Sequence, residues 1–233
     1  MTGTFINVGT VLVGTFIGAF FGARLPGGLQ QRVLAGLALV TLVIGVENAL
    51  AWQTGHFRTQ LCVLGGVLVG GLIGEALGIE RGLQGVGDRI QARTGGGTVS
   101  EAFFTATLLF CVGPLTVVGA IDDGLRGDYQ LLATKAVLDG FASIALASAL
   151  GWGVGLAAIS VLVIQGGISL AAGLFDTVLA EGSEALAALT SAGGVLIIGI
   201  SLKLADIKDV RVGNFLPALV LAPALVGIAR LFT

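Results

Sequence analysis

The sequence predicts an all-α fold: a polytopic membrane bundle of about eight (seven or eight) transmembrane helices that forms one domain over residues 1–233. Three observations lead to this fold class. Hydrophobic residues make up 55% of the chain and charged residues only 11%, whereas soluble domains carry about 25% charged residues. The apolar residues form runs close to the ~20 residues with which a helix crosses a bilayer. The polar breaks between these runs are short, which favours one compact bundle over separate domains.

The first span is interpreted as a retained helix and not as a signal peptide, because it is long and no positive charge precedes it. The seventh span is short, and the sequence also allows an earlier start near Ala185. The eight expected spans are Phe5–Ala23, Val33–Trp52, Gln60–Ile79, Ala102–Ile121, Tyr129–Leu150, Gly153–Leu174, Ser191–Leu204 and Asn214–Phe232.

The longest polar break has a helical pattern of its own. Apolar residues recur at helical spacing between Ile79 and Ile90, and charged residues occupy the rest of the wheel. This predicts an amphipathic helix over about residues 79–94 that lies in the plane of the cytoplasmic surface as an interfacial brace.

Lysine and arginine placement orients the bundle in the membrane. Cytoplasmic loops carry an excess of these residues. An outside N-terminus places eight of them inside (Arg24, Arg32, Arg81, Arg89, Arg93, Lys203, Lys208 and Arg211) and three outside (Arg58, Arg126 and Arg230). We therefore expect the N-terminus to lie outside.

The chain contains an internal similarity. The segment 9–18 matches 65–74, with glycines at corresponding positions, and the end of the second span resembles the seventh. Repeat units over about 1–79 and 153–233 are therefore expected, as in many secondary transporters. Chance similarity between glycine-rich apolar segments is the alternative explanation.

Two ionisable residues lie inside the fifth span. Lys135 and Asp139 are four residues apart, so they share one helix face, and Asp139 falls about midway along the span. Ionisable groups in the bilayer are costly and often functional. A neutral pair that locks two helices together is a nearly equal alternative to a binding site.

Two other spans carry candidate breaks at a similar depth. Gly113 and Pro114 interrupt the fourth span, where Pro114 would leave the carbonyl of Phe110 without its donor. Gln165, Gly166 and Gly167 form a polar, flexible stretch in the sixth. Broken helices beside a carboxylate form ion and substrate sites in transporters, although a kink that only serves packing is common. Thr116 could add a hydroxyl.

Two further acidic features are weaker candidates. Glu47 and Asn48 lie near the outer end of the second span, so they could contribute to a binding site. Asp122 and Asp123 follow the fourth span and would attract cations to an outer mouth, although a solvated loop explains them equally well.

The sequence gives no support for an enzyme. It contains neither a zinc-protease H-E-x-x-H motif nor a phosphate-binding G-x4-G-K-[ST] loop. His56 is the single histidine, so no metal site is expected, and no cofactor is expected either. The net charge of −2 argues against a nucleic-acid partner.

Linked motifs resemble a known family. They are FCVGPLTVVGAIDDGL, GDYQLLATKAVLDGFAS, the Gln-Gly-Gly stretch and VRVGNFLPALVLAP. Over nearly its whole length the chain is similar to an uncharacterised bacterial inner-membrane family of the YqgA/YdfK type. The resemblance implies a polytopic bacterial membrane protein of the kind described as a possible transport protein, and it assigns no role to any residue.

The leading functional hypothesis is a secondary transporter for a small solute or ion. Asp139 would bind a proton or cation, Lys135 would tune it, and the two breaks would supply backbone ligands. Its partners would be the lipid bilayer, the solute and further copies of the chain. An ion channel or pore is the second hypothesis, and a membrane protein with a purely structural role is the third.

Overall fold

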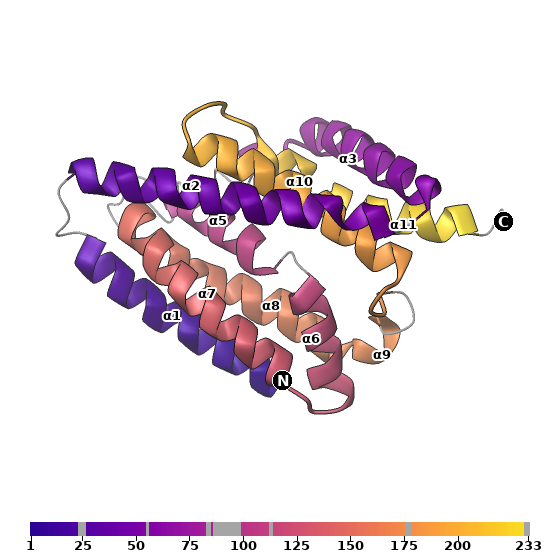
Figure 1. The fold of residues 1–233 in the computed structure, drawn as a ribbon, viewed down its shortest axis with the longest axis horizontal. Helices are drawn as coiled ribbons and strands as arrows, with labels where there is room; N and C mark the ends of the chain where they lie inside the picture. The colour runs from indigo at the N-terminus through magenta and orange to yellow at the C-terminus, as the bar shows by residue number, and fades with distance from the viewer. Residues whose placement is uncertain are drawn as a thin grey trace. The chain divides into compact units, whose positions relative to one another are not determined.

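The computed structural model describes residues 1–22, 27–54, 56–82, 85, 99–111, 114–175 and 179–230. All regular structure in these ranges is helical. The chain divides into two compact units (Figure 1). The first unit combines residues 1–37 with 84–177, and the second combines residues 38–83 with 178–233. These units do not follow the repeat boundaries suggested by the sequence, 1–79 and 153–233, which stay a prediction.

The predicted fold class is confirmed. Seven helices in the described ranges are long and apolar enough to cross a membrane, and a bent pair of helices raises the number to eight. The seven are Thr2–Gly22, Ala35–Gln53, Phe57–Leu77, Gln130–Leu150, Trp152–Leu170, Glu184–Leu204 and Val212–Arg230. The seventh span predicted from sequence does begin earlier than Ser191, at Glu184.

The first unit is organised around α1 (Thr2–Gly22) and α7 (Gln130–Leu150), which pack together along their length. The glycines of α1 form the contact, since a Cβ at Gly14, Gly18 or Gly22 would overlap the carbonyl oxygens of Gly140, Ile144 and Ser148 respectively. Small residues allow such close approach between membrane helices. The order of these pairs shows that α1 and α7 are parallel. The helices of this unit are α1 (Thr2–Gly22), α5 (Val99–Cys111), α6 (Pro114–Leu125), α7 (Gln130–Leu150), η2 (Trp152–Leu156), α8 (Ala157–Leu170) and α9 (Ala172–Phe175).

The bent pair α5 and α6 crosses the first unit from end to end. The two helices meet at an angle of 62°. Val99, at the start of α5, packs against Gly153 just after α7 ends, with 2.8 Å between its Cα and a Cβ built on that glycine. Near the end of α6, Asp123 accepts a hydrogen bond from the backbone of Gly3 at the start of α1. Because α1 and α7 are parallel, these two contacts lie at opposite ends of the unit. The pair is therefore one bent span and not a loop that returns to the same side.

The second unit is built around α10 (Glu184–Leu204), the most buried of the seven spans. Its core consists of small residues, mainly valine and alanine from α3, α10 and α11. Gly66 and Gly70 of α3 lie against Ala222 and Ala218 of α11, with added Cβ atoms 2.7 Å and 2.6 Å from their backbones. This order makes α3 and α11 antiparallel. The helices are α2 (Gly27–Ala49), which begins in the first unit, η1 (Leu50–Thr54), α3 (Phe57–Leu77), α10 (Glu184–Leu204), η3 (Val212–Phe215) and α11 (Ala218–Arg230).

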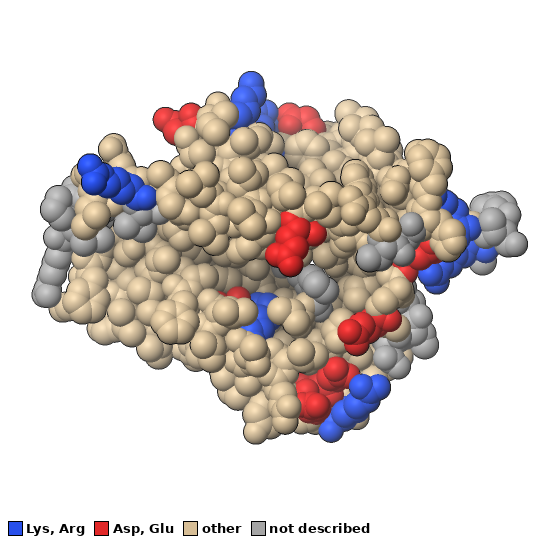
Figure 2. Space-filling view, viewed as in Figure 1, with Lys and Arg blue, Asp and Glu red and all other residues tan. Residues whose placement is uncertain are grey.

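The surface of the spans is apolar. Large hydrophobic side chains are turned outward, among them Phe16, Leu72 and Leu170, which are 74%, 72% and 78% exposed. Figure 2 shows that charged side chains are sparse on the face in view. A bilayer solvates such a surface, whereas water would not, because each exposed Å² of apolar area costs about 25 cal/mol.

Two predictions concern residues that are not described. The predicted amphipathic helix over 79–94 lies mostly outside the described residues, which include only 79–82 and 85 of that range. Gly113 also lies outside them, and so does the side chain of Pro114, although α6 begins at Pro114.

Candidate functional site

A cluster of polar side chains lies inside the first unit, where α1, α7 and α8 meet. Thr4 and Asn7 come from α1, Lys135 and Asp139 from α7, and Gln165 from α8. Thr4, Asn7 and Gln165 are fully buried, and Lys135 and Asp139 are 6% and 7% exposed. Asp139 lies nine residues into the 21-residue α7, near the middle of that span. We call these five residues the polar cluster.

Hydrogen bonds connect the whole polar cluster. Lys135 Nζ donates to Asp139 Oδ2, as the spacing of one helical turn predicted. Asn7 Nδ2 donates to Asp139 Oδ2 at 2.9 Å and to Gln165 Oε1 at 3.0 Å. Gln165 Nε2 donates to Thr4 Oγ1 at 3.2 Å. The carboxylate fixes the orientation of the Asn7 amide, because the reverse orientation would place two oxygens against each other.

Some buried polar atoms at and beside the cluster have no partner. Asn7 Oδ1 is one, and the hydroxyls of Ser143 and Ser169 are two others. Ser143 lies one turn after Asp139, and Ser169 one turn after Gln165, so both hydroxyls extend the polar face of their helix. An unsatisfied buried polar atom costs about 1–3 kcal/mol. A ligand or water bound at the cluster would supply the missing partners.

The bend between α5 and α6 lies close to the polar cluster. Cys111, the last residue of α5, is buried, and its thiol interacts electrostatically with Lys135 and Asp139. Thr116 Oγ1 donates to the carbonyl oxygen of Phe110 at 3.0 Å, and both residues are fully buried. This is the carbonyl that Pro114 cannot serve, because proline has no N–H. The hydroxyl of Thr116 satisfies it, so this carbonyl already has a partner within the protein.

The predicted break at Gln165, Gly166 and Gly167 is wrong. α8 continues through these residues and ends only at Leu170. Glycine does not by itself break a helix in an apolar environment, because no water competes for the backbone. Gln165 joins the cluster through its side chain and not through unwound backbone.

The two neighbouring aspartates of α6 have different environments. Asp123 is only 4% exposed, and its Oδ2 accepts from the backbone N of Gly3 at 3.0 Å and pairs with the Met1 amine at 2.9 Å. Asp123 was expected in a solvated mouth or loop, and this expectation is wrong. The side chain is buried at the N-terminus of α1, where the helix dipole stabilises a carboxylate. Asp122 is partly exposed and pairs with Arg126 at 2.6 Å.

Glu47 and Asn48 do not belong to the polar cluster. They lie on α2 in the second unit, where Glu47 is exposed and Asn48 half-buried. Thr4 and Asn7 belong to the polar cluster instead, although they were not predicted from the sequence. The only signal for Asn7 was an amide inside the apolar run Phe5–Ala23, and nothing marked its helix face as the one that packs on Asp139.

The second unit has a charged cluster at one end of its helices. Glu184, at the start of α10, contacts His56 Nδ1 at 2.8 Å, Arg58 Nη2 at 3.4 Å and Arg230 at 3.3 Å. It also accepts from Thr59 Oγ1 at 3.1 Å. These contacts tie α3, α10 and α11 together. A carboxylate at a helix N-terminus is stabilised by the helix dipole, so the arrangement has a structural explanation.

A second brace joins the other end of α3 to η3. Asn214 Oδ1 accepts from the backbone N of Glu80 at 2.8 Å, and Glu80 Oε2 accepts from the backbone N of Gly213 at 2.7 Å. Asn214 also donates to Glu75, which pairs with Arg211 at 3.4 Å. The backbone donors of Glu80 and Gly213 lie at the starts of helical segments, where no helical partner is available, so this second set of contacts too has a structural explanation.

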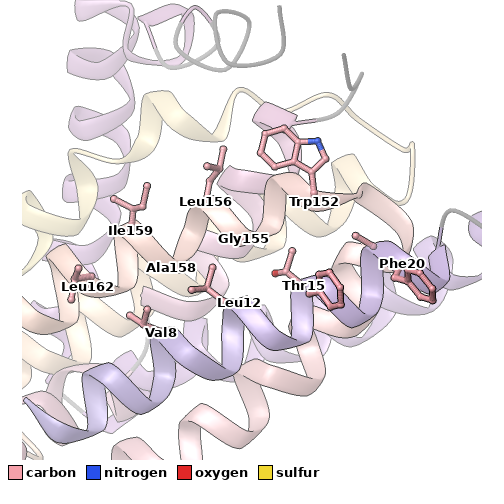
Figure 3. A pocket seen from close by; sticks show the side chains of 12 residues that line it. Val8, Leu12, Thr15, Phe20, Trp152, Gly155, Leu156, Ala158, Ile159 and Leu162 are labelled. Carbon is pink, nitrogen blue, oxygen red and sulfur yellow. The ribbon is translucent and has the colours of Figure 1, made fainter. Parts of the chain in front are cut away.

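An apolar groove of about 690 Å³ runs along the first unit between α1 and the segment η2–α8 (Figure 3). Aliphatic and aromatic side chains line it, including Leu12, Phe20 and Trp152. Thr15 contributes a buried hydroxyl without a partner. No charged residue lines this groove, so it does not match the chemistry of a site for a polar solute. Among the described residues, no group of three His, Cys, Asp or Glu could hold a metal ion.

Comparison with known proteins establishes the family. The model of the family described as "Protein of unknown function (DUF554)" matches residues 2–227, so the chain belongs to this family. The chain is 28% identical over 232 residues to the uncharacterized membrane protein YdfK of Bacillus subtilis (strain 168), covering 100% of this chain and 98% of that protein. It is 29% identical over 230 residues to the uncharacterized protein YqgA of Escherichia coli (strain K12), covering 96% and 95%. No solved structure matches the chain. The resemblance seen in the sequence is thereby confirmed.

Proposed function

We propose that this member of the DUF554 family is a secondary transporter that moves a small solute or ion across the bacterial inner membrane, with its binding site at the polar cluster. The observation that carries the proposal is the buried pair of Lys135 and Asp139 in the middle of α7, bonded to the amides of α1 and α8.

Stability alone is a weak reason for such a pair. Desolvation of two charges consumes most of their Coulomb attraction, and well-packed apolar residues of similar volume are often as stable. Ionisable residues inside membrane spans commonly mark substrate, ion or proton pathways. The bent span α5–α6 beside the pair supports the same conclusion, because discontinuous helices next to polar groups are typical of transporter binding sites.

Alternating access gives a test that needs no knowledge of the solute. A carrier exposes its site to each side of the membrane in turn, so Ser143, one turn from Asp139 and fully buried, becomes accessible to water from both sides. The Ser143→Cys variant is made in a chain whose Cys62 and Cys111 are replaced by alanine. A small membrane-impermeant methanethiosulfonate reagent is then applied to right-side-out and to inside-out vesicles.

We expect the Ser143→Cys variant to be labelled in both vesicle preparations. The matched control is Ser191→Cys on α10, a serine that is also fully buried but lies outside the polar cluster, and it should stay unlabelled. A folded Ser143→Cys protein that no reagent reaches from either side would overturn the proposal and support a structural role. Ion currents far above carrier turnover in planar bilayers would overturn it in favour of a channel.

A further inference from the structure

Buried hydroxyls continue the polar cluster in both directions along the helices of the first unit. Ser169 lies one turn beyond Gln165 on α8, and Ser143 lies one turn beyond Asp139 on α7. Thr15 of α1 is a third such residue. All three are at most 6% exposed, and their hydroxyls have no hydrogen-bond partner among the described residues. We call the polar cluster together with Ser169, Ser143 and Thr15 the polar row.

Ser169 lies at the end of the unit where α1 and α7 begin. A Cβ built on Gly124 of α6 would overlap the carbonyl oxygen of Ser169. Asp123, the neighbour of this glycine, accepts a hydrogen bond from the backbone N of Gly3 at 3.0 Å. Gly3 in turn packs against Leu132 near the start of α7. The hydroxyl of Ser169 therefore marks this end of the polar row.

Ser143 and Thr15 lie further along α1, beyond the polar cluster. A Cβ built on Gly14 of α1 would be 2.9 Å from the Cβ of Ser143. At the next residue of α1, the Cγ2 of Thr15 lies 3.2 Å from a Cβ built on Gly155 of η2. These two hydroxyls therefore mark the second end of the polar row.

The polar row covers a large part of the membrane thickness. It runs along α1 from Gly3 past Thr4 and Asn7 to Thr15. Gly3 and Thr15 are twelve residues apart, which is about 18 Å of helix in a hydrocarbon layer of roughly 30 Å. Among the described residues, six buried side-chain atoms have no hydrogen-bond partner, and four of them belong to the row. Unsatisfied polar atoms are therefore concentrated along this line.

The charges of the polar row favour an uncharged solute. Lys135 and Asp139 are in direct contact and neutralise each other, and the other side chains of the row are amides and hydroxyls. A cation would compete with the ammonium group for the carboxylate, and an anion would compete with the carboxylate for the ammonium group. A net charge inside a low-dielectric site is costly. An uncharged solute adds no charge and leaves the pair intact.

The unpartnered atoms indicate which groups this solute carries. The carboxylate fixes the amide of Asn7, whose Oδ1 is buried and can only accept, so the solute needs an N–H or O–H donor there. The hydroxyls of the row can both donate and accept. At Thr15 the row reaches the apolar groove (Figure 3), none of whose described lining residues is charged. Entry into such a groove costs an ion far more than an uncharged molecule.

We infer that the polar row is the path of a small uncharged solute with hydroxyl or amide groups, which it hydrogen-bonds in succession from Ser169 through Asn7 to Thr15. The unpartnered atoms of the row supply the bonds that the solute loses when it leaves water. No net charge crosses the membrane with the solute. The inference rests on the transport function proposed above.

Uptake of isotope-labelled solutes into proteoliposomes tests the chemical class. The uncharged solutes are urea, glycerol and erythritol, the zwitterion is glycine, and the charged solutes are Na⁺ and phosphate. We expect at least one uncharged solute to enter faster than it enters protein-free liposomes, and the charged solutes and glycine to enter at the protein-free rate. A membrane potential imposed with valinomycin and a potassium gradient should not change the uptake, since no charge moves.

Two variants at the ends of the polar row separate this role from a structural one. Thr15→Val and Ser169→Ala each remove one unpartnered hydroxyl with little change of shape. We expect uptake of the uncharged solute to fall about fivefold in each, the effect of one lost neutral hydrogen bond on a rate. The melting temperature should not fall, because no bond within the protein is lost. Thr15→Ser keeps the hydroxyl and should retain the uptake.

The matched control is Ser191→Ala on α10. This serine is also fully buried and its hydroxyl also has no partner among the described residues, but it lies outside the polar row. Its replacement should leave the uptake unchanged.

Three results would overturn the inference. The first is accelerated uptake of charged solutes or glycine only. The second is uptake in Thr15→Val and Ser169→Ala as fast as in the unmodified protein, because the hydroxyls then do not bind the solute. The third is no accelerated uptake of any solute in the panel. In that case transport of another solute stands if Ser143→Cys is labelled from both sides, and both proposals fail if it is not. Should Thr15→Val or Ser169→Ala not fold, the same uptake measurement on Ser143→Ala decides instead.

Discussion

The coupling free energy between Lys135 and Asp139 can be measured by replacing each residue alone and both together. The variants are Lys135→Leu, Asp139→Leu and the double replacement. Asp139→Leu leaves a buried ammonium without its counterion, and it also removes one acceptor from the amide of Asn7. Breaking a buried pair from one side costs about 3–5 kcal/mol, and the lost neutral hydrogen bond adds about 1 kcal/mol. Lys135→Leu should cost less, because the remaining carboxyl group can take up a proton and become neutral.

The double replacement should be much milder than the sum of the two single ones. Two leucines bury no charge, so we expect a net cost of about 1–2 kcal/mol, which comes mainly from the unpaired amide of Asn7. The coupling free energy between the two sites is then several kcal/mol. It is measured as the free energy of unfolding of detergent-solubilised protein during a titration with SDS, followed by circular dichroism.

The ion pair of Lys203 and Asp209 is the matched control. Its Nζ–Oδ1 distance is 3.5 Å, and the Asp209 side chain is 79% exposed. The same double-replacement cycle there should give a coupling below about 1 kcal/mol, because exposed pairs contribute little. If the coupling of Lys135 with Asp139 is no larger than in this control, the buried pair does not form and the reasoning about the polar cluster is wrong. If the double variant is stable and folded, stability does not explain why the chain contains this pair.

Two further changes test the packing around the cluster, each by thermal denaturation in detergent. Gly18→Ala should destabilise the protein by about 1–3 kcal/mol, because its Cβ would lie 2.9 Å from that of Ala147 and would overlap the carbonyl of Ile144. Gly9→Ala, with nothing within 4 Å, should be neutral or up to about 1 kcal/mol stabilising, and equal effects at both glycines would contradict the close contact of α1 with α7. Thr116→Val should cost about 1–3 kcal/mol by leaving the buried carbonyl of Phe110 without a donor. Thr134→Val, whose hydroxyl bonds to Gln130 on the exposed surface, should stay within about 0.5 kcal/mol, and a Thr116→Val variant that is just as mild would argue against that hydrogen bond.

Composition and the length of the apolar runs were sufficient to predict the membrane fold. Both properties are set by the solvent, because a bilayer requires about 20 apolar residues for each crossing. The spacing of Lys135 and Asp139 was equally informative, since a contact between residues one turn apart depends only on the helix.

Contacts between helices could not be predicted in this way. The amide of Asn7 faces Asp139 only because α1 and α7 are parallel and in a register that brings Gly14 against Gly140. Asp123 looked like part of a solvated pair until its contact with the start of α1 was known. The carbonyl of Phe110 was correctly identified as the one that Pro114 leaves without a donor, but its partner Thr116 lies on the next helix. In each case the missing information is a tertiary register that a single sequence does not contain.

The segments 9–18 and 65–74 carry glycines at corresponding positions, and the structure shows what these glycines contact. Gly14 and Gly18 in the first copy correspond to Gly70 and Gly74 in the second, and all four lie where another helix approaches at backbone distance. The partner helices, however, run in different directions: α7 is parallel to α1, whereas α11 is antiparallel to α3. A duplicated unit that kept its internal packing would show the same direction in both copies. One packing requirement, a close approach between apolar helices, is sufficient to explain the shared pattern, and the repeat units stay a prediction.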